Sequence, residues 1–128
     1  MKLLLDTHAL IWWLAGDAPL PRPVRDAIDE DRAQVFVSAA SAWEIATKVR
    51  IGKLPGAAAI AGDISRVILN EGFRPLSVTV EHGQRAGALP GPLRDPFDRM
   101  LIAQAMLENL HLVSIEHAFE AYGVLRLW

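Results

Sequence analysis

The chain alternates short apolar runs with longer segments of helical periodicity, and this alternation constrains its fold more than any other feature. Five runs have the length and residue types of buried strands. They span residues 2–5, 35–37, 75–78, 110–114 and 124–127. Because two neighbouring parallel strands need a crossover connection, usually a helix, the alternation predicts a mainly parallel sheet with helices on both faces. We therefore expect an α/β fold: a three-layer α/β/α sandwich around a sheet of about five strands.

Three segments between these runs have the apolar spacing of helices. Two are amphipathic, and the third, residues 98–109, is apolar almost all round, so we expect it to be buried; Asn109 is suited to end it in a left-handed conformation. The amphipathic segments are marked by Ala42, Ile45, Ala46 and Val49, and by Ile60, Ile64, Val67 and Ile68. Residues 16–23, 52–56 and 89–96 are rich in Pro and Gly. We interpret them as loops within a single domain that spans residues 1–128.

Composition narrows the class of protein. Hydrophobic residues make up 52% of the chain and charged residues 22%, which is typical of a globular protein. The net charge of −2 gives no support for a nucleic-acid partner, which would need a local basic patch or a metal bridge. The absence of cysteine excludes disulfides and thiolate chemistry, and we expect a cytoplasmic protein. No apolar run approaches the roughly 20 residues that span a bilayer, so we expect no membrane segment. Asp6 and His8 interrupt the apolar N-terminal run, and no small-residue cleavage site follows, so we expect no signal peptide.

Four acidic residues fall where a parallel sheet gathers its ligands, beyond the carboxyl ends of the strands. Asp6 directly follows the first predicted strand, and Glu116 follows the run 110–114. Glu44 lies in the helix after the second strand, and Asp98 lies in the first turn of the buried helix. Clustered carboxylates repel one another unless a cation compensates, and Mg²⁺ or Mn²⁺ prefers oxygen ligands. The predicted chemistry is metal-assisted hydrolysis of a phosphodiester bond.

Two of these acids also have a local explanation in helix structure. The sequence Asp95-Pro96-Phe97-Asp98 has the pattern of a helix start, with Asp95 as the N-cap and Pro96 at the first helical position. Asp98 nevertheless begins an otherwise apolar face of its helix. Glu44 is placed to form an i,i+4 ion pair with Lys48 in the favourable order. Capping and ion pairing do not exclude metal binding, so both interpretations stay open here.

The other two acids have equally local alternatives. Asp6 can hydrogen-bond the start of a helix that begins near His8, with Thr7 as the cap. Glu116 can be a solvated acid in a loop. Basic residues flank the proposed cluster, and Lys48 and Arg99 are candidate contacts for a phosphate backbone. A zinc site is not supported, because the histidines show no i,i+3 or i,i+4 pairing. They are His8, His82, His111 and His117.

Four sequence blocks carry a resemblance that runs essentially from end to end. They are "LLLDTHALIWWL", "VSAASAWEIATKVRIGKL", "RDPFDRMLIAQA" and "LVSIEHAFEAYGV". In that order they resemble the motif blocks of the PIN-domain family, specifically the VapC-type toxins of bacterial toxin–antitoxin pairs. The resemblance implies a small α/β/α domain that binds Mg²⁺ or Mn²⁺ and hydrolyses RNA as an endoribonuclease. It also implies a VapB-type antitoxin as inhibitor and a homodimer.

The resemblance also assigns the site residues. Asp6 matches the acid after the first strand, Glu44 the helix acid, and Asp98 the acid that precedes "LIAQA". Glu116 is a departure, because relatives commonly carry Asp at this position. This departure supports an alternative hypothesis, a catalytically weak or inactive PIN-like module that binds RNA or protein. A phosphatase-like hydrolase with Asp6 as nucleophile is a third interpretation, but His8 stands where a second Asp is expected.

Overall fold

The computed structural model describes residues 1–16 and 19–128, and within them the strands form one five-stranded sheet in the order β3-β2-β1-β4-β5. Every neighbouring pair is parallel, and Leu4 on the central strand lies opposite both Phe36 and Leu112. The strands are β1 Lys2–Leu5, β2 Gln34–Ser38, β3 Arg74–Leu76, β4 His111–Val113 and β5 Arg126–Leu127. The predicted parallel sheet is confirmed.

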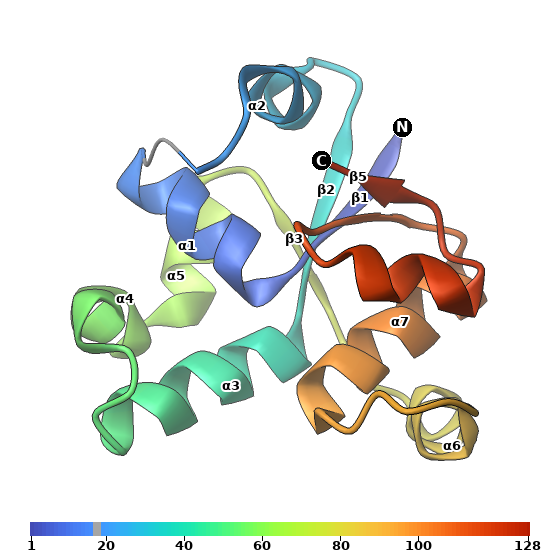
Figure 1. The fold of residues 1–128 in the computed structure, drawn as a ribbon. Helices are drawn as coiled ribbons and strands as arrows, with labels where there is room; N and C mark the ends of the chain where they lie inside the picture. The colour runs from blue at the N-terminus through green and yellow to red at the C-terminus, as the bar shows by residue number, and fades with distance from the viewer. Residues whose placement is uncertain (17–18) are drawn as a thin grey trace.

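Helices cover both faces of this sheet (Figure 1). The α-helices are α1 Thr7–Ala15, α2 Arg22–Asp29, α3 Ala39–Arg50, α4 Ala58–Ala61, α5 Ile64–Asn70, α6 Val80–Ala88 and α7 Pro96–Glu108, with 3₁₀ turns η1 Pro55–Ala57 and η2 His117–Tyr122. Side chains alternate across the strands, so Leu3 and Leu5 join a core with α1, α2 and α5, whereas Leu4 joins a core with α7 and η2. The predicted three-layer sandwich is therefore confirmed.

Several helices differ from the sequence-based expectation. Neither α2 nor α6 was predicted, and α2 begins at Arg22, inside the predicted loop 16–23, whose residues 17 and 18 lie outside the described residues. The segment marked by Ile60 to Ile68 is divided into α4 and α5, because the Asp63 side chain accepts a hydrogen bond from the backbone N–H of Arg66 and starts a new helix. The buried helix ends as predicted, with Asn109 at φ 55°.

Side chains at the carboxyl edge of the sheet turn the chain directly from strand to helix. Asp6 follows β1 and accepts a hydrogen bond from the N–H of Ala9, which begins α1. Ser38 ends β2 and accepts from the N–H of Ala40, which begins α3. The N-terminal ends of α1 and α3, and that of α7, therefore lie at the same edge (Figure 1). Within residues 1–16 and 19–128, no helix is long and apolar enough to cross a membrane.

Candidate active site

Asp6 is a buried carboxylate at the carboxyl end of the central strand. Its backbone N–H donates to the carbonyl of Val113 at 3.0 Å, which ties it to β4, and its side chain caps α1. Burial raises the pKa of Asp6 above its ordinary value, and this effect exceeds the lowering by the Ser114 hydroxyl, the Ala9 N–H and the charge of His8. The capping alternative from the sequence is thus confirmed, with Asp6 itself rather than Thr7 as the N-cap.

Glu44 is buried on α3 and both of its carboxylate oxygens have partners. Oε1 accepts a hydrogen bond from the Thr7 hydroxyl at 2.5 Å, and the same hydroxyl lies 3.1 Å from the Ser41 Oγ. Oε2 forms an ion pair with Lys48, which confirms the predicted i,i+4 pair. Burial opposes the charge of Lys48, but the hydrogen bond and the charge of Glu44 outweigh it and raise the pKa of Lys48. A polar chain therefore joins the start of α1 to α3.

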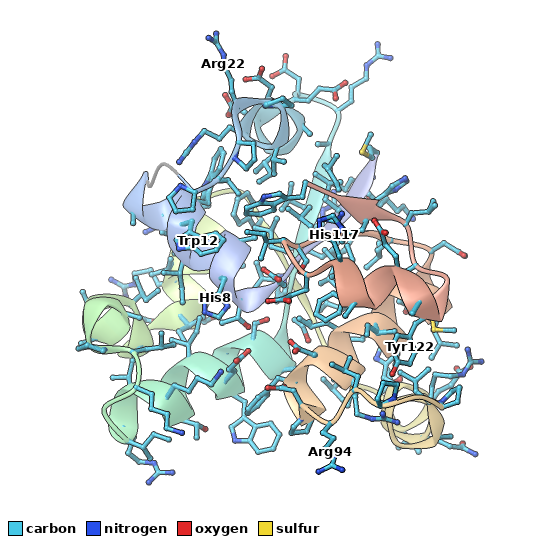
Figure 2. All side chains as sticks on the ribbon, viewed as in Figure 1. His8, Trp12, Arg22, Arg94, His117 and Tyr122 are labelled. Carbon is cyan, nitrogen blue, oxygen red and sulfur yellow. The ribbon has the colours of Figure 1, made fainter. Side chains whose placement is uncertain are left out.

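Asp98 faces the other acids from the first turn of α7. Asp95 is the N-cap, accepting from the N–H groups of Phe97 and Asp98 at 2.9 and 3.0 Å, so the carboxylate of Asp98 is not needed as a cap. Partial burial raises the pKa of Asp98 to about 7, together with the negative charges of Asp95, Glu44, Asp6 and Glu116. The four predicted acids thus act electrostatically on one another, and Figure 2 shows side-chain oxygens gathered between α1, α3 and α7.

Glu116 reaches the same edge from the segment after β4. It is exposed, and its N–H donates to the Ser114 hydroxyl at 3.0 Å. Among residues 1–16 and 19–128, no group forms a hydrogen bond or ion pair with the carboxylate of either Asp98 or Glu116. Two of the four acids are therefore held by hydrogen bonds or an ion pair, and the carboxylates of the other two have no such partner among the described residues.

The donor set fits a hard divalent cation by its chemistry. Within the described part of the chain, no three His, Cys, Asp or Glu side chains are arranged as a ready-made metal cage. All four candidate donors are carboxylates, however, and partial burial together with the negative charges of the other acids raises the pKa of Asp98. A doubly charged ion that prefers oxygen ligands relieves that repulsion. Because Asp98 and Glu116 have no competing partners among the described residues, their carboxylate oxygens are available to such an ion.

The two candidate basic residues have different environments. The Lys48 ammonium pairs with Glu44 and lies 5.9 Å from the centre of the Phe97 ring, close to the acids. The Arg99 guanidinium instead donates to backbone carbonyls at the end of α6 and in the segment between α6 and α7. Its acceptors are Ala86 at 2.9 Å, Leu93 at 2.7 Å, Gly87 at 3.3 Å and Leu89 at 2.5 Å. This pairing makes Arg99 an anchor for that loop and leaves little of it for a phosphate contact.

Sequence reasoning did not identify all the polar groups of the site. Neither Ser41 nor Ser114 was among the predicted site residues, yet Ser41 lies beside Thr7 and Ser114 interacts with Asp6. The spacing holds a signal for Ser41, which precedes Glu44 by three residues and so shares its helix face. Ser114 gives no such signal, because it meets Asp6 only through the pairing of β1 with β4.

The fold and the site together define a class of protein: parallel α/β/α domains with an acidic site at the carboxyl edge of the sheet. The chain belongs to the PIN-domain family, whose family model matches residues 3–125. It is 38% identical to Ribonuclease VapC16 of Mycobacterium tuberculosis over 79 residues, 56% of this chain and 56% of that protein. The match thus spans about half the length of the curated relative.

Solved structures show the same fold at low sequence identity. VapBC2 from Rickettsia felis, bound to a DNA fragment from its promoter, is similar with a TM-score of 0.73 at 14% identity, covering 99% of this chain and 98% of that one. VapC20 of M. tuberculosis, a toxin that cleaves the sarcin–ricin loop, is similar with a TM-score of 0.70 at 17% identity, covering 96% of each chain. The resemblance seen in the sequence blocks is confirmed at the level of the family.

Proposed function

We propose that this protein is a metal-dependent endoribonuclease of the VapC type, the toxin of a toxin–antitoxin pair. The observation that carries the proposal is the free carboxylate of Asp98, which faces the charges of Asp6, Glu44 and Glu116 and has its pKa raised to about 7. Such crowding costs stability, and binding a cation is what offsets it. The name of the curated relative, a ribonuclease, supports the same activity.

Each acid has a role that follows from its environment. Asp6 and Asp98 would hold Mg²⁺ or Mn²⁺ directly, with Glu44 and Glu116 completing the cluster or orienting waters. When bound, the ion supplies an activated water for in-line attack on the phosphate and neutralises the charge that develops there. Thr7 and Lys48 fix the Glu44 carboxylate, so its position does not depend on the substrate. Lys48 also provides positive charge beside the acids for a phosphate of the RNA backbone.

The partners follow from the family. We propose a VapB-type antitoxin, a homodimer and a cytoplasmic location, where RNA is available as substrate. Similar folds occur in VapBC2 and in a toxin–antitoxin complex from Klebsiella pneumoniae. An adjacent gene that encodes a small protein with a DNA-binding N-terminus would support the pairing. Co-purified with this chain, that partner should abolish RNA cleavage, and an adjacent product that neither binds nor inhibits would refute it.

The chemistry is tested by incubating the purified protein with structured and single-stranded RNA, with Mg²⁺ or with a chelator. Cleavage is expected only with the ion. Asp98→Asn should reduce cleavage by at least about a hundredfold, because loss of a direct ligand should cost no less than the roughly 10- to 100-fold that loss of an outer-shell partner costs a metal site. Asp63→Asn is the matched control, because Asp63 caps α5 outside the site and Asn is also a good N-cap. Equal cleavage by both variants would refute the proposed site.

The alternative, an inactive PIN-like module that binds RNA or protein, rests on Glu116. This acid is exposed and one methylene longer than the Asp that relatives commonly carry, so its reach toward an ion differs. Calorimetry with Mn²⁺ separates the two functions. An active nuclease should bind Mn²⁺ in a manner that Asp98→Asn abolishes, whereas the inert module should bind none at this cluster.

A further inference from the structure

An apolar groove lies beside the acids, between α3, α6 and α7. It encloses about 460 Å³, within the range of small-ligand pockets, and its lining includes Ala39, Ala40, Trp43, Ala86, Phe97 and Met100. Trp43 stands at the groove with 64% of its surface exposed. A tryptophan with this much area in water is suited to contact a partner, because burying a large aromatic side chain contributes strongly to the free energy of binding.

The groove lies close to the acidic site, and Phe97 links the two. The Phe97 ring lines the groove, and its centre lies 5.9 Å from the Lys48 ammonium, which pairs with Glu44. The rings of Trp43 and Phe97 meet edge to face, with centres 4.9 Å apart and an interplanar angle of 73°. This contact braces the indole while most of it stays exposed. Whatever occupies the groove is therefore adjacent to the acids that would hold the scissile phosphate.

The chemistry of the groove matches a nucleobase better than a phosphate. Its lining is apolar, and the Arg99 guanidinium, which also lines it, donates to backbone carbonyls. Acidic side chains lie close by and would repel an unpaired phosphate. A flat aromatic base carries no charge and stacks on aromatic side chains without regard to sequence.

We infer that this groove binds an unpaired nucleobase of the RNA, stacked on the Trp43 indole, next to the phosphate that is cut. The inference rests on the proposed ribonuclease function and adds a substrate preference to it. Bases in an A-form duplex are paired and stacked on one another, so their faces are not available to a protein ring, whereas bases in loops and single strands can be turned out and stacked. The groove thus selects unpaired RNA.

The test measures RNA binding without cleavage, in the Asp98→Asn background with Mg²⁺ present. The probe is a short fluorescein-labelled single-stranded oligoribonucleotide of mixed sequence, with matched versions that lack the base at one position at a time. Removing one particular base should weaken binding about tenfold when Trp43 is present and have no effect after Trp43→Ala. Trp43→Phe should restore most of the difference. Leu69→Ala, which removes a similarly exposed apolar side chain from α5, is the control and should behave like the parent.

Several results would overturn the inference. One is equal loss of affinity for the complete and the base-lacking probes after Trp43→Ala, and another is no loss at all. A change in molar mass in solution caused by Trp43→Ala, without a base-dependent loss of affinity, would show that a second copy of the chain covers the groove. Failure of the ribonuclease proposal is distinguished by a separate measurement: the wild-type protein would then leave every RNA uncut with Mg²⁺, whatever Trp43→Ala does to binding.

Discussion

The hydroxyl of Thr7 lies 2.5 Å from the Oε1 of Glu44, so the first residue of α1 holds a buried acid of α3. The two residues are 37 positions apart in the chain, and the parallel pairing of β1 with β2 brings them together. The Thr7 hydroxyl and the Lys48 ammonium thus provide partners for both oxygens of a carboxylate that is almost fully buried.

Replacing Thr7 by Val tests this bond with little change of shape. Loss of the hydroxyl leaves one oxygen of Glu44 buried without a partner, which should lower the free energy of unfolding by about 1–3 kcal/mol. Urea denaturation measures the change. Thr7→Ser keeps the hydroxyl and should stay within about 0.5 kcal/mol of the wild type. Equal losses in the two variants would show that the Thr7 methyl packing, and not the bond, matters.

The partial burial of Asp98, together with the acids around it, should make stability fall as pH rises. Its pKa in the folded protein is about 7, above the ordinary value of 3.8, so the folded state holds a proton that the unfolded state releases. Stability should therefore decline between about pH 4 and pH 7, in the presence of a chelator. Asp98→Asn should flatten this decline and stabilise the protein by about 1–2 kcal/mol above pH 7, after allowance for solvent screening of a partly exposed group. A decline unchanged by the substitution would assign it to other groups.

Divalent cations should reverse that loss. Because Mn²⁺ binds only the folded site, it should raise the melting temperature, with a stabilisation of about 2.7 kcal/mol at a hundred times its dissociation constant. Asp98→Asn should lose most of this gain, and Asp63→Asn should keep it. Thermal unfolding with increasing Mn²⁺ measures the effect. A gain of the same size in Asp98→Asn would place the ion elsewhere on the protein.

The sequence was sufficient to predict the sheet and the placement of the acids, because both follow from local patterns. Asp6 comes directly after an apolar run that is typical of a buried strand, and Asp98 lies in the first turn of a helix whose start is indicated by Asp95 and Pro96. The edge at which these elements meet is a general property of parallel sheets. How closely the carboxylates approach one another, by contrast, depends on side-chain partners that no local pattern reveals.

The two helices that were not predicted, α2 and α6, show why other parts of the fold were harder to predict from the sequence. Helix α2 has only 8 residues, of which Val24 and Ile28 are buried. It follows a proline-rich segment, and such segments are typical of loops. In α6 the cap is a reciprocal pair of Thr79 with His82, where a glutamate or glutamine is usual. The interior of α6 also contains two glycines, which weaken a helical pattern. Packing against α7 stabilises α6, although the sequence of α6 alone does not predict a helix.

Arg99 is the residue whose role changed most between sequence and structure, and its removal gives the last prediction. Its guanidinium holds carbonyls at both ends of the segment between α6 and α7, so Arg99→Met should destabilise the protein by about 2–4 kcal/mol. Lysine should not restore this loss, because one ammonium cannot reach the same fork of acceptors. Arg94, which points away from the protein in Figure 2, supplies the control, and Arg94→Ala should stay within about 0.5 kcal/mol of the wild type. Chemical denaturation with hydrogen exchange of residues 89–95 measures both. A stable Arg99→Met protein with unchanged exchange but weakened RNA binding would return Arg99 to the phosphate-contact role.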